Sequence, residues 1–304
     1  MTRKLLLVLG LSFHAAAHGA VDYDVVVYGS TPAGIAAATA AGHLGMRVAL
    51  FEPLKMIGGM GAAGNLALND GGVAAERTGL ARNFSLLNAE YYGLKPGTEV
   101  PHPESFVSNS TFYKMLGDAG VRTVKLDCRL LSAKATHGTP SKIAQIEVFC
   151  ERQPISATVF VDASYDGDIM VMAGNIDYTS GREAMSTYQE SYGGARKPGF
   201  VGVGGPKHVN ALDDDGNIIK YVANISQLAP PESADGALMA FQHRMCISGD
   251  PDRVPWPKPE GYDPKDFLLI QRSLTAGGIA FNWSPLPGYP GTKKKCLIRP
   301  ILVY

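Results

Sequence analysis

Residues 24–52 alternate between apolar runs and glycine-containing turns. Val25–Tyr28 is a continuous apolar run bounded by an acidic residue and a glycine, which is typical of a buried parallel strand. The Ala-rich segment Ile35–Leu44 has a high helix propensity. Arg47–Phe51 is apolar after its first residue and favours a second strand. The order strand, helix, strand predicts a βαβ unit.

Three further apolar runs predict an antiparallel meander between residues 124 and 161. Val124–Ala133 and Ile143–Cys150 favour strands, and the sequence His-Gly-Thr-Pro at 137–140 favours a turn between them. Val159–Val161 favours a third strand, which runs into an acid-rich turn at 162–168.

Two of the four cysteines lie in this predicted meander. Cys128 and Cys150 are equally far from Thr139, so they could face each other across the hairpin and form a disulfide in an oxidising compartment. Two buried free thiols are the alternative. The other cysteines are Cys246 and Cys296, and no Cys-x-x-Cys spacing of a zinc ribbon or thioredoxin-type motif occurs.

The first twenty residues have the layout of a secretory signal peptide. Arg3 and Lys4 precede a mostly apolar run at 5–13, and small residues follow. The apolar run is shorter than the roughly 20 residues that span a bilayer, and no later stretch has the pattern of a membrane span. We therefore expect residues 1–20 to be cleaved and the protein to be secreted to the extracellular space. A slightly long apolar N-terminal arm is the alternative.

The sequence also contains glycosylation motifs, which agree with secretion. Four N-glycosylation sequons begin at Asn83, Asn109, Asn224 and Asn282.

Lys plus Arg and Asp plus Glu both number 28, so the formal net charge is zero. Without a basic excess, nothing favours nucleic acid as a partner, and we expect a small-molecule substrate. The sequence gives no indication of the oligomeric state.

The turn after the first strand has the spacing of a dinucleotide-binding motif. Residues 29–34 are Gly-Ser-Thr-Pro-Ala-Gly, a G-x-G-x-x-G pattern in which Thr31 takes the place of the middle glycine. Gly29 allows the tight turn, Gly34 allows close packing of helix on strand, and the start of the helix would face a diphosphate. Thr31 is compatible with this role if it points away from the phosphates or if its hydroxyl joins the phosphate contacts. Glu52, at the tip of the second strand, is placed to accept hydrogen bonds from ribose hydroxyls.

Two later segments favour FAD over NAD as the dinucleotide. Residues 58–64 are Gly-Gly-Met-Gly-Ala-Ala-Gly, and such a run lets the backbone approach a flat group closely. A typical NAD-binding domain would continue into another helix and strand at this point. The acid-rich turn at 162–168, Asp-Ala-Ser-Tyr-Asp-Gly-Asp, follows the third meander strand.

Together these segments resemble the FAD-dependent oxidoreductase family of the glutathione-reductase-like flavoprotein superfamily. The resemblance covers about residues 22–288 and depends on the motifs at 29–34, 58–60, 162–168 and on Gly-Arg-Glu at 181–183. It implies an α/β fold, with a Rossmann-like FAD-binding domain containing an antiparallel β-meander and an α+β substrate domain. The implied boundaries are 21–168 for the FAD-binding domain, 169–288 for the substrate domain and 289–304 for an atypical C-terminal tail.

The resemblance also implies FAD as the cofactor and the residues that hold it. Residues 29–34 would hold the diphosphate, Glu52 the ribose, and 58–60 the ribityl chain and flavin. Leu130 would meet adenine through its backbone, and the acid-rich turn would close around the diphosphate. The expected cofactor-binding residues are Gly29, Ser30, Thr31, Pro32, Ala33, Gly34, Glu52, Pro53, Gly58, Gly59, Met60, Leu130, Asp162, Ala163 and Asp168. For Asp166 and Asp168 a solvated acidic turn is the alternative.

The C-terminal part departs from the family pattern. In this superfamily the last strand of the FAD domain returns near the C-terminus, and no matching segment follows residue 288. We expect a truncated, alternatively spliced or mispredicted C-terminus; the alternative is a short family member whose last strand is Leu297–Val303.

No catalytic residues and no metal site are predicted. Flavin carries out hydride or electron transfer itself, so the protein need not supply a nucleophile or an acid–base pair. The seven histidines have no metal-ligand spacing. The sequence thus favours a secreted FAD-dependent oxidoreductase. The alternatives are a truncated, non-catalytic flavin-binding relative and an NAD(P)-linked dehydrogenase.

Overall fold

The computed structural model describes most of the N-terminal half of the chain and several segments of the rest. The described residues are 21–63, 77–138, 141–174, 178–189, 193–195, 209–220, 222, 226, 229–238, 241–247, 251, 255, 257–276, 284–285 and 297–303. The expected signal peptide, two of the sequons, Gly64 and Cys296 lie outside them.

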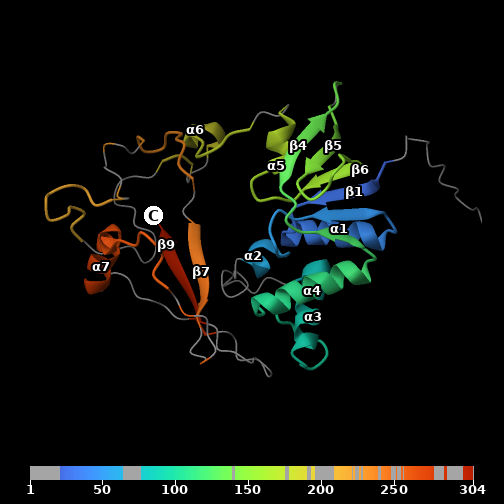
Figure 1. Cartoon of the computed structure of the whole chain (residues 1–304), viewed down its shortest axis with the longest axis horizontal. Helices are drawn as coiled ribbons and strands as arrows, with labels where there is room; N and C mark the ends of the chain where they lie inside the picture. The colour runs from blue at the N-terminus through green and yellow to red at the C-terminus, as the bar shows by residue number, and fades with distance from the viewer. Residues whose placement is uncertain are drawn as a thin grey trace, which may run out of the picture.

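A six-stranded mixed sheet forms the centre of the N-terminal part, with the order β3-β2-β1-β6-β5-β4 (Figure 1). The strands are β1 (Tyr23–Tyr28), β2 (Val48–Phe51), β3 (Thr123–Lys125), β4 (Leu130–Ala135), β5 (Ile143–Val148) and β6 (Ile155–Asp162). Strands β3, β2, β1 and β6 are parallel, whereas β4, β5 and β6 are antiparallel neighbours. The mixed α/β class and the predicted meander are therefore confirmed.

Five helices accompany this sheet in the described residues. They are α1 (Pro32–His43), α2 (Gly59–Ala62), α3 (Gly79–Tyr91), α4 (Ser105–Asp118) and α5 (Asp168–Ala173). Helix α1 connects β1 to β2, so the predicted βαβ unit is confirmed, although the helix begins three residues earlier than the Ala-rich run indicated.

The prediction of one strand over Val124–Ala133 is wrong. The chain pairs with β2 only as far as Lys125 and then leaves the parallel sheet through Asp127, which has a positive φ of 55°. The backbone N–H groups of Asp127 and Cys128 donate to the carbonyls of Leu54 and Glu52, so this segment follows the loop after β2. The apolar positions of the two halves follow one another with no glycine or proline between them, and such a pattern alone does not reveal where the chain changes its neighbour.

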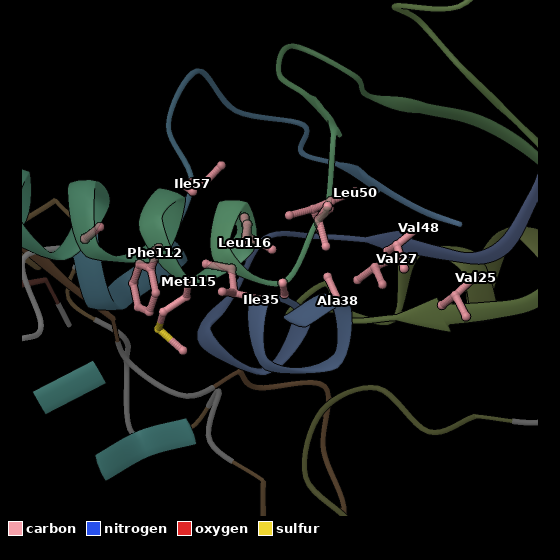
Figure 2. Close-up of a cluster of buried hydrophobic side chains, with 13 residues drawn as sticks. Val25, Val27, Ile35, Ala38, Val48, Leu50, Ile57, Phe112, Met115 and Leu116 are labelled. Carbon is pink, nitrogen blue, oxygen red and sulfur yellow. The ribbon is translucent and has the colours of Figure 1, made fainter. Parts of the chain in front are cut away.

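Period-two alternation along β1 and β2 separates two cores. Val25 and Val27 face α1 and α4, where they pack with Ile35 and Leu116 in the cluster shown in Figure 2. The intervening residues of the same strands face the meander and α5. They belong to a second cluster of Val26, Tyr28, Ala49, Phe51, Cys128, Leu130, Ala133, Ile146, Val148, Ile155, Ala157 and Ile169. A strand buried on both faces explains the continuous apolar run in the sequence.

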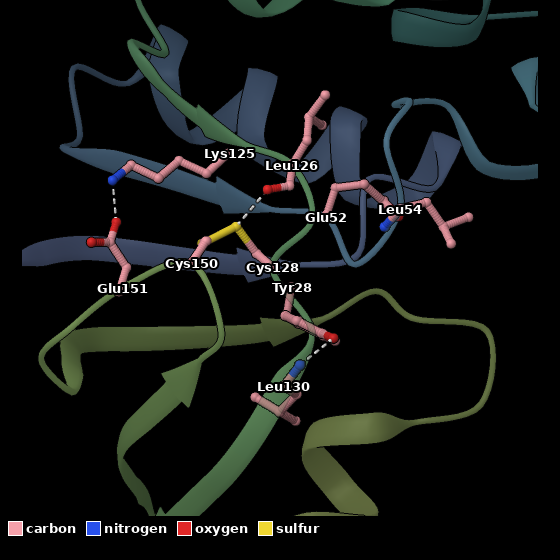
Figure 3. Close-up of a disulfide and its surroundings, with 9 residues drawn as sticks. All are labelled: Tyr28, Glu52, Leu54, Lys125, Leu126, Cys128, Leu130, Cys150 and Glu151. Atoms are coloured by element: carbon pink, nitrogen blue, oxygen red, sulfur yellow. Dashed lines mark hydrogen bonds and ion pairs between the residues drawn. A yellow bond between two sulfur atoms is a disulfide. The ribbon is translucent and has the colours of Figure 1, made fainter.

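Cys128 and Cys150 form a disulfide (Figure 3). Cys128 lies just before β4 and Cys150 just after β5, so the bond closes the open end of the hairpin. Of the two sequence-based alternatives, the disulfide is confirmed and the pair of free thiols is wrong.

The C-terminal half contributes a smaller, separate sheet. Its strands are β7 (Phe241–Ile247), β8 (Ser284–Pro285) and β9 (Leu297–Val303), in the order β7-β9-β8. Three helices complete the described elements there: α6 (Met185–Tyr188), η3 (Pro264–Phe267) and α7 (Leu268–Thr275). A strand at Leu297–Val303 is thus present, but it pairs antiparallel with β7 and not with the six-stranded sheet (Figure 1).

No helix within the described residues has the length and apolar character needed to cross a membrane.

Candidate functional site

The turn from β1 into α1 is packed tightly against the turn that follows β6. Gly29 has φ +91°, and a Cβ there would lie 2.7 Å from the backbone of Ala163 and Ser164. A Cβ on Gly34 would lie 2.0 Å from the carbonyl oxygen of Gly29. Both glycines are therefore required for the turn and for the close packing of helix on strand, as the motif predicted.

Thr31 serves as the N-cap of α1. Its Oγ1 accepts a hydrogen bond from the Gly34 N–H at 3.2 Å and donates one to the Ala163 carbonyl at 2.9 Å. Pro32 follows at the first helical position, where its missing N–H costs nothing. The hydroxyl is thus turned into the protein, which is the first of the two ways in which a threonine could replace the middle glycine.

Glu52 is buried at the tip of β2 and points to the same turn. Its Oε2 accepts hydrogen bonds from the Ser30 N–H at 2.7 Å and from the Ser30 hydroxyl, while Oε1 accepts one from the Leu54 N–H at 2.9 Å. A carboxylate offers about four acceptor sites, so Oε1 retains capacity for a hydroxyl. Pro53 follows Glu52 and is half-buried in the loop after β2.

A pocket of about 570 Å³ opens between this turn and the turn after β6. Its walls are Thr31, Pro32, Ala33, Met60, Gly61, Asp162, Ala163, Ser164 and Tyr165. The backbone N–H groups of Thr31 and Ala33 have no protein acceptor in the described part of the chain. At the positive end of a 12-residue helix, such donors suit an anion such as a diphosphate.

Of the predicted segment Gly58–Met60, only Met60 lines the pocket, together with the following Gly61. Gly58 and Gly59 have positive φ values of 102° and 49°, and the Gly58 N–H donates to the Ser30 carbonyl at 2.8 Å. The Met60 N–H donates to the hydroxyl of Tyr165 at 2.7 Å, and a Cβ on Gly59 would lie 2.4 Å from that hydroxyl. The glycines thus allow this segment to approach both the α1 turn and Tyr165, whose side chain is exposed.

The acid-rich turn lines the pocket with its first four residues and is held in place by hydrogen bonds to the Asp162 carboxylate. Asp162 Oδ1 accepts hydrogen bonds from the N–H and hydroxyl of Ser164, and Oδ2 accepts one from the Met170 N–H at 3.1 Å. Asp168 begins α5 and does not line the pocket. Burial raises the pKa of its carboxyl, and the charges of Asp162 and Asp166 raise it further. Asp168 is partly buried whereas Asp166 is exposed, so the solvated turn considered as an alternative describes Asp166 but not Asp168.

Leu130 is the first residue of β4 and lies next to the last residue of β1. Its backbone N–H donates to the Tyr28 hydroxyl at 2.8 Å (Figure 3). The expected contact of its backbone with adenine remains a prediction, and the structure gives this N–H a protein partner.

Sequence reasoning missed two tyrosines that shape the site. Tyr28 was assigned only to the apolar run of β1, although a tyrosine that ends a buried strand needs a partner for its hydroxyl. Tyr165 lies inside the acid-rich motif, of which only Asp162, Ala163 and Asp168 were predicted to contact the cofactor. For both, the missed signal is a phenol next to a predicted ligand-binding turn.

The described residues contain no group of three or more His, Cys, Asp or Glu side chains arranged to hold a metal ion. The Asp213–Asp215 run forms a turn in which the Asp213 carboxylate accepts from the N–H groups of Asp215 and Asn217.

The sequence as a whole matches a known family. A family model described as FAD dependent oxidoreductase matches residues 24–298. FAD fits the residues present: free amides at the start of α1 face the pocket, the pocket wall contains glycine backbone, and Glu52 retains an acceptor beside the turn. No curated protein matches the chain.

Solved structures share parts of the fold at low identity. The THI4 protein of Thermovibrio ammonificans is 19% identical with a TM-score of 0.39, over 53% of this chain and 66% of that one. A geranylgeranyl bacteriochlorophyll reductase-like protein of Thermoplasma acidophilum is 20% identical with a TM-score of 0.34, over 50% and 42%. Lactococcus lactis thioredoxin reductase is 19% identical with a TM-score of 0.30, over 46% and 35%. This chain therefore covers less than two thirds of each of these three proteins.

Proposed function

This chain belongs to the FAD-dependent oxidoreductase family, and on that premise we propose that it transfers a hydride or electrons between a small organic substrate and FAD. FAD supplies the redox chemistry, and the protein supplies its position and its electrostatic surroundings. The finer assignment to the glutathione-reductase-like superfamily is part of this proposal.

The observation that carries the proposal is the joint position of three groups at one turn, two of them on the wall of the pocket. The free N–H groups of Thr31 and Ala33 lie at the positive end of α1, and the Glu52 carboxylate is bonded to the adjoining Ser30. An anion of the cofactor would be held by the amides and a sugar hydroxyl by Glu52. No Lys or Arg is among the described residues that line the pocket.

We also propose that the protein is secreted. The Cys128–Cys150 disulfide supports this, because such bonds persist mainly in oxidising compartments. Among the described sequons, Asn83 is exposed on α3 and is the candidate for glycosylation. The Asn109 side chain instead donates to the Ile57 carbonyl at 3.1 Å, which makes it a poor acceptor for a glycan.

The domain division remains part of the proposal, with FAD binding over residues 21–168 and substrate binding over 169–288. In the second part, Arg182 and Asp235 form a bidentate ion pair that joins two segments far apart in the sequence. Strand β9, which lies within the expected C-terminal tail, pairs with β7 of the second part.

The test is the visible spectrum of the purified, full chain with and without added FAD. A yellow protein whose flavin is released on denaturation and identified as FAD would support the proposal. Anaerobic bleaching by a small organic donor would then identify the substrate. A colourless protein that takes up no FAD but binds a nicotinamide dinucleotide would contradict it. A yellow protein that no donor bleaches would favour the non-catalytic alternative.

A further inference from the structure

A second pocket of about 300 Å³ lies between α1 and the pair α3 and α4. Its walls are almost wholly apolar, with Ile35 from α1, Leu80 and Phe84 from α3, and Phe112 and Met115 from α4. The rings of Phe84 and Phe112 stack at 4.6 Å between centroids and form one rigid side. A volume of this size is at the lower end of the range for small-molecule sites.

The only charged side chain among the lining residues is Arg77, just before α3. Its guanidinium is 3.9 Å from Glu99 Oε2, which is too far for a hydrogen bond. Glu99 is held more closely by Arg82, whose Nε donates to Oε1 at 3.0 Å. Within the described residues the planar donor fork of Arg77 therefore makes one long ion pair and no hydrogen bond, at the edge of an apolar cavity.

We propose that this pocket binds an organic carboxylate with an apolar body. The body would lie against the stacked phenylalanines and Met115, and the carboxylate would accept hydrogen bonds from Arg77, whose fork matches two carboxylate oxygens. A neutral apolar molecule would leave Arg77 unused, and a polyanion would meet only one cation.

The pocket shares Pro32 and Gly61 with the larger pocket described above. A molecule bound here would therefore lie next to the proposed FAD site, separated from it by the first turn of α1 and by α2. The inference does not depend on FAD, because Arg77, the stacked phenylalanines and Met115 line this pocket and not the larger one.

Isothermal titration calorimetry of the full chain with decanoate and with 1-decanol tests the proposal. We expect the wild type to bind decanoate more tightly than 1-decanol. Arg77→Gln should weaken decanoate binding about tenfold, the loss typical of a hydrogen bond to a charged group, and leave 1-decanol binding unchanged. Arg122→Gln is the matched control, since Arg122 is exposed and lines neither pocket.

A filling variant completes the test. Ala81→Phe places a ring at an exposed lining position and should abolish binding of both probes. The proposal is overturned if the wild type does not bind decanoate or if Arg77→Gln and Arg122→Gln lose the same affinity. Should Ala81→Phe fail to fold, as judged by circular dichroism, the two arginine variants still decide the outcome.

Discussion

The Tyr28 hydroxyl oxygen accepts a hydrogen bond of 2.8 Å from the backbone N–H of Leu130. Tyr28 is the last residue of β1, directly before the turn that opens α1, and Leu130 is the first residue of β4 (Figure 3). The bond therefore joins the candidate cofactor turn to the meander. Burial raises the pKa of the Tyr28 hydroxyl, which favours the neutral phenol.

Replacing Tyr28 with Phe should destabilise the fold without changing its shape. The variant removes the acceptor and leaves the Leu130 N–H buried and unpaired, a loss of about 1–3 kcal/mol in the free energy of unfolding. Urea denaturation followed by circular dichroism measures this loss. Tyr188→Phe, at an exposed position, is the control that should change nothing. Equal midpoints for Tyr28→Phe and wild type would contradict the assigned bond.

Replacing Thr31 with Val should also destabilise the protein, because it removes the N-cap of α1 and the bond to the Ala163 carbonyl. The expected loss is about 1–2 kcal/mol. Thr31→Ser keeps the hydroxyl and should retain most of the stability in the same urea titration. If serine and valine were equally harmful, the methyl group and not the hydroxyl would be the important part of Thr31.

The departure at Thr31 illustrates how much the sequence could predict. Gly29 and Gly34 have steric roles that follow from the motif, so both were predicted and both are confirmed by the contacts a Cβ would make. The direction of the Thr31 hydroxyl depends on Ala163, which is distant in sequence, and the motif could not decide between its two alternatives.

The same reason explains what was missed in the meander and at the pocket. The disulfide was one of two alternatives that the sequence left open, because the symmetry of Cys128 and Cys150 about a turn is a local property. Strand β3 ends at Lys125 because the following residues form hydrogen bonds with the loop after β2. The position of Tyr165 at the pocket depends on the hydrogen bond that its hydroxyl accepts from the Met60 N–H. Partners that lie far apart in the chain leave no periodic signal.

Replacing Glu52 with Gln should weaken FAD binding more than it weakens the fold. An amide keeps one acceptor but loses the charge, and hydrogen bonds to charged groups contribute about 1.5–3 kcal/mol. We therefore expect the dissociation constant for FAD to rise roughly tenfold to hundredfold. Titration of the apoprotein with FAD, followed by flavin fluorescence, gives this constant. Glu99→Gln serves as the control, and an unchanged constant for Glu52→Gln would argue against a contact with ribose.

The raised pKa of the Asp168 carboxyl predicts that the stability of the fold depends on pH. The pKa of its carboxyl in the folded protein is raised above its ordinary value of 3.8 by burial and by the neighbouring acids. The folded state then holds the proton more tightly than the unfolded state, so stability falls as pH rises from 3.8 through the folded pKa and levels off above it. Asp168→Asn should raise the melting temperature at pH 7 and lose this advantage near pH 3. Asp215→Asn, in an exposed turn, is the control, and an equal effect at both pH values would contradict the assigned shift.

The disulfide links redox state to the cofactor site. Cys128 is fully buried, and its N–H donates to the carbonyl of Glu52, so the bond to Cys150 fixes the segment that supports this proposed ribose ligand. Closing a loop with a sequence separation of 22 residues is expected to stabilise the fold by about 3 kcal/mol. The double variant Cys128→Ala/Cys150→Ala should lose roughly this amount in urea denaturation and bind FAD more weakly. Dithiothreitol should destabilise the wild type in the same way and affect the double variant less, since that variant keeps only Cys246 and Cys296. A wild-type midpoint that does not move after verified reduction of the bond would show that the hairpin is held by its packing alone.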